Sequence, residues 1–566
     1  MRVSRLALVL SALLPALAVA APVVFYQDIS SGPGGGGEGD NGAYLTLYGR
    51  GFGATRGTSR VTVGGGEVGG YKVWTDTRIS VQIGHAATSG EVLVTTADGN
   101  ARSPDGFTVR PGRVWFVSLT GNDSTCVAND VTRPCRTANH LARDVPAQAG
   151  DVIVVRGGTY RASNAAEGWV NSTFARPTVS GTPSAPISLM GYPGEDVVLR
   201  MDQAARLFAH YENVSYWTIA NFRVIVQNCT PEGIVMLGSP VTPAACNDPT
   251  SVSPYARAIR LVGLDIDGQG VGGMCGGSGG DLVEIGTSDS VKVLGVQVHD
   301  TSPANASEPT HAIYLSAPQS GTEVGWNRVY NIPHSRALIQ LHEDSFGGAC
   351  WGKDSITDIS VHDNEITNVA GQAILLDGGV GAVQIYDNVL TQVGLPTDHR
   401  YEDVIALRGA GGRMKARVLH NTIVVDPNAG SAGWIFGVGG AGVAYCPESL
   451  EISNNILKVT GVGDTYFGFE SWCSSFRPTG SNNVWVGGGA APAFDVAPVT
   501  QDPALDAGLR PTAASPGNGR GATGTGILLD HDGRVRRSPP DIGAWDYAAG
   551  TPALPVPANV RLQRRN

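Results

Sequence analysis

The sequence predicts an all-β protein in which a small β-sandwich precedes a long parallel β-helix. The composition is rich in helix interrupters, with 77 Gly and 34 Pro, and in β-branched residues that suit strands. Short strands separated by Gly-rich turns fill the first hundred residues. Further along, short strands recur with apolar residues and Asn at matching positions, a pattern that is typical of stacked coils.

The first twenty residues have the pattern of a secretory signal peptide. Arg2 and Arg5 precede an apolar run, which ends in the small residues Ala18-Val19-Ala20. Pro15 interrupts the run, which is short for a membrane span, although a retained anchor is the alternative. We expect residues 1–20 to be cleaved off and the product to be secreted, extracellular or periplasmic, without a membrane span.

Charge and cysteine content limit the partners and the compartment. The formal net charge is -10 and no basic run exists, which disfavours nucleic acid as a partner. An anionic glycan remains a possible partner, because a local cluster of Arg can make the electrostatic potential positive at one site. Eight Cys in an exported chain predict four disulfides, and the absence of a close Cys-x-x-Cys pair disfavours a metal site. Sequence proximity suggests the pairs Cys126–Cys135, Cys229–Cys246, Cys275–Cys350 and Cys446–Cys473, although other connectivities remain open.

Residues 22–110 form the first predicted unit. Strands such as 44–48, 60–63 and 91–95 alternate with Gly-rich turns, as in a small sandwich. The stretches "LTLYGRGFG", "SRVTVGGGEV", "WTDTRISVQI", "SGEVLVTTADG" and "DGFTV" resemble the IPT/TIG family of immunoglobulin-like domains, in the family's order. The resemblance implies a spacer or binding module. Because Arg110-Pro111-Gly112 is a linker candidate, we expect the unit to fold alone and to be dispensable for turnover.

A column of Asn residues marks the coils of the second unit. The strands "ITDISVHDNEI", "AVQIYDNVL", "KARVLHNTI", "LEISNNIL" and "EVGWNRV" align on Asn364, Asn388, Asn421, Asn455 and Asn327. Asn at a turn tolerates left-handed geometry and can hydrogen-bond along a stack. We therefore predict a structural ladder without a catalytic role, and the same for His362 and His420, which lie next to it.

A second alignment predicts a polar stripe on one face of a sheet. The strands "DLVEI", "HAIYL", "ALIQL", "QAILL" and "DVIAL" share two apolar positions, which period-two alternation points inward. The first position holds Val283, Ile313, Ile339, Ile374 and Ile405, and the second holds Ile285, Leu315, Leu341, Leu376 and Leu407. The residues between them point outward: Glu284, Tyr314, Gln340, Leu375 and Ala406, followed two positions on by Ser316, His342, Asp377 and Arg408. We expect this stripe to be solvent-exposed.

Several stretches resemble pectin-lyase-like right-handed parallel β-helices. They are "VWFVSLTGNDSTC", "AGDVIVVRGGTYR", "APISLMGYPGEDVVL" and "VSYWTIANFRV", which are similar to the first coils of that fold. The resemblance implies a right-handed β-helix over residues 113–487. Residues 488–547, with "DPALDAGLRP" and "DIGAWDY", resemble the closing segment of many bacterial β-helix proteins, and residues 548–566 are expected to be disordered.

The strand "THAIYLS" looks like the His-Gly-Ile-Tyr strand of β-helix uronan epimerases, with Ala312 in place of the usual Gly. The resemblance implies that His311 is a base. The Asp-Pro-His-Asp run of those enzymes is absent, which weakens an epimerase function. The same short strand occurs in proteins without known catalysis, so a turn-capping role for His311 is the alternative.

The stripe suits proton abstraction at carbon 5 of a uronic acid. The substrate carboxylate must be neutralised while charge develops, and Arg336 or Arg408 could pair with it. His311 or His342 would accept the proton, and Tyr314 would protonate the departing oxygen or return a proton to the sugar. Elimination gives a lyase, and reprotonation on the other face gives an epimerase.

Other readings of these residues stay open. Asp377 with Glu402 or Glu343 could serve a glycoside hydrolase, but the polygalacturonase motifs are missing. Asp265 and Asp267 in "LDIDGQG" could bind calcium, although a turn role is favoured. The sequence establishes no cofactor, and calcium stays open.

We therefore predict a secreted, monomeric polysaccharide lyase that acts on an anionic, uronic-acid-containing extracellular glycan. In this hypothesis His311, Tyr314, His342 and Arg408 are catalytic, and the substrate-binding residues are Arg336, Gln340, Asp377 and Glu402. The alternatives are a uronate C5-epimerase, a glycoside hydrolase, and a non-catalytic glycan-binding or adhesion protein. The sequence does not identify the glycan or its linkage.

Overall fold

The computed structural model describes most of the chain between residues 21 and 547. The segments outside the described residues are 211–213, 228–234, 238–255, 270–280, 287, 302–310, 317–320, 334, 336, 343–357, 379–380, 396–402, 410–413, 426–433, 440–445 and 461–464. The predicted signal peptide and C-terminal tail also lie outside them, so both stay predictions. Among the described residues, no helix has the length and apolar character that a membrane crossing requires.

Residues 23–109 fold as a small β-sandwich. One sheet has the order β1 (Val23–Gln27), β3 (Tyr44–Arg50), β7 (Arg78–Gln82) and β6 (Gly70–Trp74). The other has the order β5 (Gly66–Glu67), β4 (Arg60–Val63), β8 (Val92–Thr96) and β9 (Gly99–Arg102). All pairs within the two sheets are antiparallel. A parallel pair, β2 (Ser31–Gly32) with β10 (Thr108–Val109), closes one end. Alternate side chains of both sheets, such as Leu45 and Val61, share one apolar cluster.

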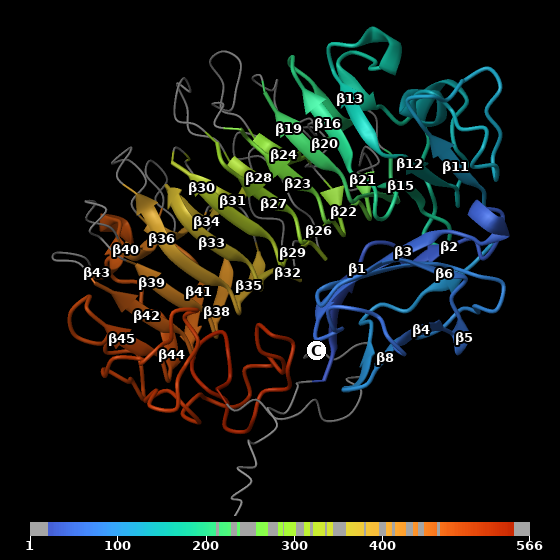
Figure 1. The fold of residues 1–566 in the computed structure, drawn as a ribbon. Helices are drawn as coiled ribbons and strands as arrows, with labels where there is room; N and C mark the ends of the chain where they lie inside the picture. The colour runs from blue at the N-terminus through green and yellow to red at the C-terminus, as the bar shows by residue number, and fades with distance from the viewer. Residues whose placement is uncertain are drawn as a thin grey trace, which may run out of the picture.

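Three long parallel sheets follow and form the faces of a β-helix (Figure 1). The first sheet contains β11 (Val114–Val117), β12 (Val152–Val155), β15 (Ile187–Gly191), β18 (Trp217–Ala220), β22 (Arg260–Val262), β26 (Lys292–Leu294), β29 (Glu323–Gly325), β32 (Ile359–His362), β35 (Ala382–Tyr386), β38 (Lys415–Leu419), β41 (Ser449–Ser453) and β44 (Thr479–Ser481). The second contains β13 (Gly158–Arg161), β16 (Val197–Met201), β19 (Arg223–Val226), β23 (Asp265–Asp267), β27 (Gln297–His299), β30 (Arg328–Ile332), β33 (Glu365–Ala370), β36 (Val389–Leu395), β39 (Thr422–Val425), β42 (Ile456–Val459) and β45 (Val484–Val486).

The third sheet carries the predicted stripe. It contains β14 (Thr173–Ala175), β17 (Arg206–His210), β20 (Val235–Leu237), β24 (Asp281–Ile285), β28 (His311–Ser316), β31 (Ala337–His342), β34 (Gln372–Gly378), β37 (Asp403–Gly409), β40 (Trp434–Val438) and β43 (Thr465–Phe469). Each strand pairs with the corresponding strand of the next coil, so that one apolar cluster fills the interior. These sheets confirm the predicted fold class, an all-β protein with a parallel β-helix after a small sandwich.

The remaining elements are short. β21 (Ala256–Arg257) pairs with β25 (Ser288–Asp289). Helical segments are single turns: η1 (Glu38–Asp40), η2 (His140–Asp144), η3 (Ala165–Glu167) and η5 (Ser471–Cys473).

The predicted Asn column is a buried hydrogen-bonded ladder between the first and second sheets. Each side-chain amide donates to the side-chain oxygen of the next coil at 2.8–2.9 Å. The ladder contains Asn327, Asn364, Asn388, Asn421, Asn455 and also Asn483, all of them fully buried. Asp495 ends the ladder. Its carboxylate accepts a hydrogen bond from the Asn483 amide at 2.8 Å, but it has no N–H group that could donate to a further coil. The structural role predicted for these residues is confirmed.

The residue before each ladder Asn is in the left-handed conformation, and so is the corresponding residue in the three preceding coils. The nine turns from Asn221 to Asn482 have φ between 52° and 64° at Asn221, Gly263, Gly295, Trp326, Asp363, Asp387, His420, Asn454 and Asn482. This conformation lets the chain turn sharply from one sheet to the next. The side chains at these turns face away from the core, so each turn offers a contact point to another part of the protein.

The sandwich covers the first four of these turns. Asn221 accepts a hydrogen bond from Tyr48 and donates one to Asp28 at 2.9 Å. A Cβ at Gly263 or Gly295 would collide with the hydroxyl of Tyr48 or Tyr26. Apolar residues of the sandwich and of the first sheet belong to one cluster. We therefore expect deletion of residues 22–110 to destabilise the β-helix, which revises the expectation that the unit is dispensable.

The closing segment covers the remaining five turns, on the same side of the β-helix as the sandwich (Figure 1). Arg536 pairs with Asp387 of one turn and with Asp546 of its own segment. The amide of Asn454 donates to the carbonyl of Ala522 at 2.9 Å. The closing segment therefore binds the turns through polar contacts, whereas the sandwich binds them mainly through aromatic rings.

Two of the predicted disulfides lie within the described residues and are present: Cys126–Cys135 and Cys446–Cys473. Cys229, Cys246, Cys275 and Cys350 lie outside these residues, so their pairing stays a prediction.

Replacing Asn388 with Ala should lower the free energy of unfolding by about 3 kcal/mol, because it leaves buried polar groups of two neighbouring coils without partners. The amide of Asn388 donates to the carbonyl of Val361, and its oxygen accepts from the backbone N–H of Asn364. Urea denaturation measures the change. Asn100→Ala, at an exposed position of the sandwich, is the control and should change stability by less than about 0.5 kcal/mol. Equal effects of the two variants would contradict a stabilising ladder.

Stability should fall as the pH rises from about 6.5 to 9, because the closing segment contains a protonated His531. Burial lowers the pKa of His531, but the hydrogen bond to Glu365 and the charge of Asp363 outweigh it and raise the pKa to about 9. The raised pKa stabilises the fold below the unfolded pKa, and this contribution of about 3 kcal/mol disappears as the pH passes 9. His531→Gln should flatten this slope in thermal melts, whereas His85→Gln, an exposed control, should retain it.

Candidate functional site

The register of the third sheet agrees with the sequence alignment. Ile313 pairs with Ile339, Ile339 with Ile374, and Ile374 with Ile405. The second apolar position pairs in the same way, and both positions are buried in the interior cluster. The alternating residues therefore point out of the β-helix, as predicted.

Two outward columns run along the axis of the β-helix. The middle column contains Glu284, Tyr314, Gln340, Leu375, Ala406, Gly437 and Gly468. Two residues further along each strand, the distal column contains Ser316, His342, Asp377 and Arg408. Adjacent coils are about 4.8 Å apart, so neighbouring side chains of a column can contact one ligand.

Tyr314, His342 and Asp377 form a connected polar chain across three coils. The Tyr314 hydroxyl lies 3.0 Å from Nδ1 of His342. Nε2 of His342 lies 3.8 Å from the Asp377 carboxylate. The carboxylate favours the tautomer with the proton on Nε2, so that Nδ1 accepts the hydrogen bond from Tyr314. The imidazole is thereby oriented between an acid and a hydroxyl.

Arg408 follows Asp377 in the distal column and is half-buried. Within the described part of the chain, its guanidinium has neither a hydrogen bond nor an ion pair. A partly buried arginine usually has an anionic or hydrogen-bonding partner, because desolvating a charge without one is costly. Its position suits an anion that binds from outside.

A third column lies at the first residue of each strand, where simple alternation would point the side chains inward. It contains His311, Ala337, Gln372, Asp403, Trp434 and Thr465. Three larger side chains of this column instead turn onto the outer face. A Cβ at Gly437 would collide with the Asp403 carboxylate, and a Cβ at Gly468 would collide with the Trp434 ring. The His311 ring stacks on that of Tyr314 with centroids 5.1 Å apart.

The expectation that the stripe is solvent-exposed is therefore wrong for the middle column. In this column Tyr314 is 7% exposed, and Gln340, Leu375 and Ala406 are fully buried. His311 of the third column is also 7% exposed. Side chains from the first position of the strands lie over the middle column, which explains part of this burial. The distal column is more open, with His342 and Asp377 side chains about a fifth exposed, at 21% and 18%.

Sequence analysis missed three residues of this face: Gln372, Asp403 and Trp434. Gln372 donates to the Asp403 carboxylate at 3.1 Å, and both side chains are buried. Extending the alignment two residues toward the start of each strand would have found them. Their outward direction could not be inferred, because alternation fails where the chain bends into the strand.

Two proposed substrate-binding residues, Arg336 and Glu402, lie outside the described residues, as does Glu343 of the hydrolase alternative. The structure therefore brings together His311, Tyr314, Gln340, His342, Asp377 and Arg408 on one sheet.

The acidic residues considered for calcium form an ion-pair network on the second sheet. Nε2 of His299 lies 2.9 Å from Asp265, and Arg223 lies 3.8 Å from Asp265 and 3.5 Å from Asp267. The hydrogen bond to Asp265 raises the pKa of His299, although burial opposes it. Asp267, His299 and Asp300 also approach one another, but cationic side chains already neutralise the carboxylates. The arrangement does not fit calcium, which prefers a cage of oxygen ligands.

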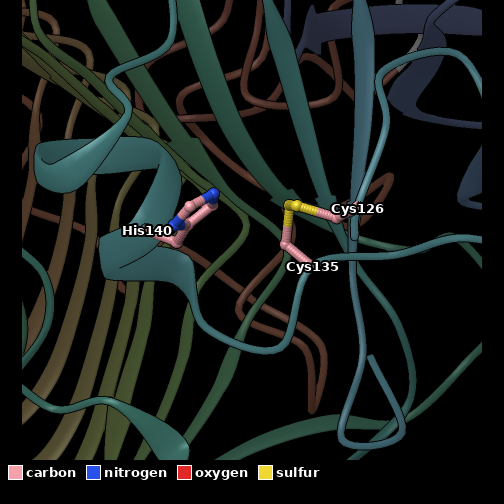
Figure 2. A group of neighbouring side chains, drawn as sticks. All are labelled: Cys126, Cys135 and His140. Atoms are coloured by element: carbon pink, nitrogen blue, oxygen red, sulfur yellow. A yellow bond between two sulfur atoms is a disulfide. The ribbon is translucent and has the colours of Figure 1, made fainter. Parts of the chain in front are cut away.

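A second cluster near the start of the β-helix does not fit a metal either. Figure 2 shows Cys126 and Cys135 beside His140. The two cysteines are joined as a disulfide, so their sulfur atoms are not thiolate ligands.

Comparisons with known proteins identify no family. No protein-family model and no curated protein matches the sequence. Among solved structures, the chain is similar to XylC in complex with xylose, at 12% identity, with a TM-score of 0.39, over 69% of this chain and 87% of that chain. It is also similar to a rhamnogalacturonan lyase (15% identity, TM-score 0.37, 66% and 87%) and to the pectate lyase Pel9A (13%, 0.37, 77% and 96%). Similarity at this level does not indicate which reaction the chain performs.

Arg408→Met should leave the free energy of unfolding within about 0.5 kcal/mol of the unmodified protein, because no ion pair is lost. Arg536→Met is the contrasting variant. It leaves the buried Asp387 and Asp546 without their cation and should cost more than about 3 kcal/mol. Urea denaturation of both variants makes the comparison. A large loss for Arg408→Met would mean that this arginine is structural rather than available to a ligand.

Proposed function

We propose that the protein is a secreted polysaccharide lyase that cleaves a uronic-acid-containing glycan by β-elimination on the third sheet. The observation that carries the proposal is the hydrogen-bonded pair of Tyr314 and His342, with Arg408 two coils further along the distal column. A base, an acid and a cation on one face are the groups that this reaction requires.

Arg408 has the first role in the proposed reaction, which is to bind the uronate carboxylate. Abstraction of the carbon 5 proton places negative charge on the carbon and on this carboxylate. A guanidinium that pairs with both carboxylate oxygens stabilises the charge as it develops. In the proposal Gln340, Asp377, Arg336 and Glu402 contribute to substrate binding, and Asp377 also orients His342.

His342 and Tyr314 move the protons. When substrate binds, the Tyr314 hydroxyl turns from Nδ1 of His342 to the glycosidic oxygen, which frees the Nδ1 lone pair. Nδ1 then accepts the proton of carbon 5, the electron pair forms the double bond between carbons 4 and 5, and the bond from carbon 4 to the glycosidic oxygen breaks. The Tyr314 hydroxyl protonates the departing oxygen. After product release, the imidazolium returns a proton to the tyrosinate along their 3.0 Å hydrogen bond, which restores both groups. His311, stacked on Tyr314, is the alternative base.

Other functions use the same face and are outcomes of the same test. An epimerase would begin with the same proton abstraction, and a glycan-binding protein would use the same column without turnover. The hydrolase alternative is weaker, because Asp377 lies near His342 rather than near a second acid among the described residues. The two observed disulfides fit an exported protein, and the IPT/TIG-like sandwich fits a spacer role.

His342→Ala and Arg408→Ala should each reduce turnover of a uronan by roughly a hundredfold or more, the usual effect of losing an acid–base or electrostatic group. The assay follows the ultraviolet absorbance of the unsaturated uronate across a panel of uronans. Arg328→Ala, on the exposed face of the second sheet, is the matched control and should retain activity. His311→Ala distinguishes the two candidate bases.

The outcomes of this assay separate the alternatives. Changed stereochemistry at carbon 5 without cleavage would identify an epimerase, and retention of the uronan without turnover would identify a binding protein. Near-normal activity of both variants on a confirmed substrate would place the active site elsewhere. Thermal melts of each variant show whether a loss of activity reflects unfolding.

A further inference from the structure

Trp434 is a large exposed apolar side chain on the outer face of the third sheet. It is the first residue of β40 and is 42% exposed. In the strand register it pairs with Asp403 of the preceding coil, so it belongs to the column whose larger side chains turn outward. Phe469, which is also exposed, lies at the other end of the next strand and stacks on Phe467.

The Trp434 ring rests on the backbone of the next coil. A Cβ added at Gly468 would overlap the indole atoms, so only glycine leaves room for the ring. Gly468 belongs to the middle column, which means that the missing side chain would point outward. The strand therefore supports one side of the ring, while part of the indole remains open to solvent.

We propose that Trp434 is a stacking platform for a sugar ring of the bound glycan, at a subsite separate from the reacting sugar. The inference rests on the proposed function, because it assumes that this face binds a glycan. One side of a pyranose ring presents C–H groups, which pack on the electron-rich face of an aromatic ring. Elsewhere on the same sheet, Asp377 and Arg408 suit the hydroxyl and carboxylate groups of other sugars of the same chain.

The surroundings of Trp434 favour a sugar over a protein partner. A protein interface needs a contiguous apolar patch of several hundred Å². Here the described positions around the ring are the glycines Gly437 and Gly468, the buried Asp403 and the exposed Thr465. The other exposed aromatic ring, that of Phe469, is at the opposite end of its strand. A single half-exposed indole among polar groups is the usual composition of a carbohydrate or small-ligand site, with few polar contacts and one apolar surface.

The position of the platform indicates how the glycan lies. The Trp434 ring rests at the level of β43, two coils beyond β37, which carries Arg408. Two coil spacings correspond to about 10 Å along the axis. The ring lies over Gly468, which is in register with Ala406, two residues or about 7 Å along the strand before Arg408. A glycan that contacts both groups must therefore cross the coils obliquely to the axis of the β-helix. A disaccharide bound at Arg408 would not reach the platform, whereas longer oligosaccharides would.

The test measures the affinity of the intact protein for uronate oligosaccharides of increasing length by calorimetry, under conditions without turnover. Trp434→Ala should weaken binding of the long oligosaccharides about tenfold and leave binding of the disaccharide unchanged. Trp434→Phe should retain most of the affinity, because a smaller aromatic face remains. Gly468→Ala should mimic Trp434→Ala by displacing the ring. Tyr547→Ala removes a similarly exposed aromatic residue of the closing segment and is the control.

Two results would overturn the platform: equal affinity of Trp434→Ala and the unmodified protein at every length, or an equal loss that includes the disaccharide. If the unmodified protein binds no uronate oligosaccharide, the proposed function fails, and neutral oligosaccharides then test the platform alone. Length-dependent binding of a neutral oligosaccharide that requires Trp434 would support the platform. If neither uronate nor neutral oligosaccharides bind, the platform is refuted. Thermal melts confirm that each variant is folded.

Discussion

The asparagine ladder is the interaction on which the rest of the structure depends. Each amide bonds the next coil at 2.8–2.9 Å, so the ladder fixes the distance and the register between coils at one edge of the stack. A shift by one residue would leave every rung without a partner and would turn the apolar side chains outward. Because the three sheets share these coils, the ladder also fixes the positions of Tyr314, His342 and Arg408 on the third sheet.

The sequence was sufficient to predict the repeating part of this arrangement. Asn388 and Asn421, or Ile374 and Ile405, recur with the same neighbours, and a repeat of that kind determines which residues face the core. The contacts that do not repeat could not be predicted in this way. The fit of Tyr26 against Gly295 joins residues far apart in the chain, and the end of the ladder at Asp495 depends on a carboxylate outside any coil pattern.

In the candidate site, too, one feature could be predicted from the repeat and another could not. Alternation along the strands correctly gave the outward direction of Tyr314, His342 and Arg408. It did not give their exposure, because Asp403 and Trp434 lie at strand starts where the direction of the side chain depends on the bend. The burial of Tyr314 limits the access of water to its hydrogen bond with His342, which is the contact that the proposed proton transfer would use.

The covered turns restrict how a protein of this kind can change during evolution. Stacked-coil proteins readily gain or lose coils by internal duplication or deletion. Here two tyrosine side chains of the sandwich pack on the glycine turns of two consecutive coils, Gly263 and Gly295, and the closing segment contacts the last five turns. An inserted coil would shift one of these turns by about 4.8 Å relative to the segment that it contacts. We therefore expect related proteins to keep the number of coils and to vary in the lengths of the connections that leave the third sheet.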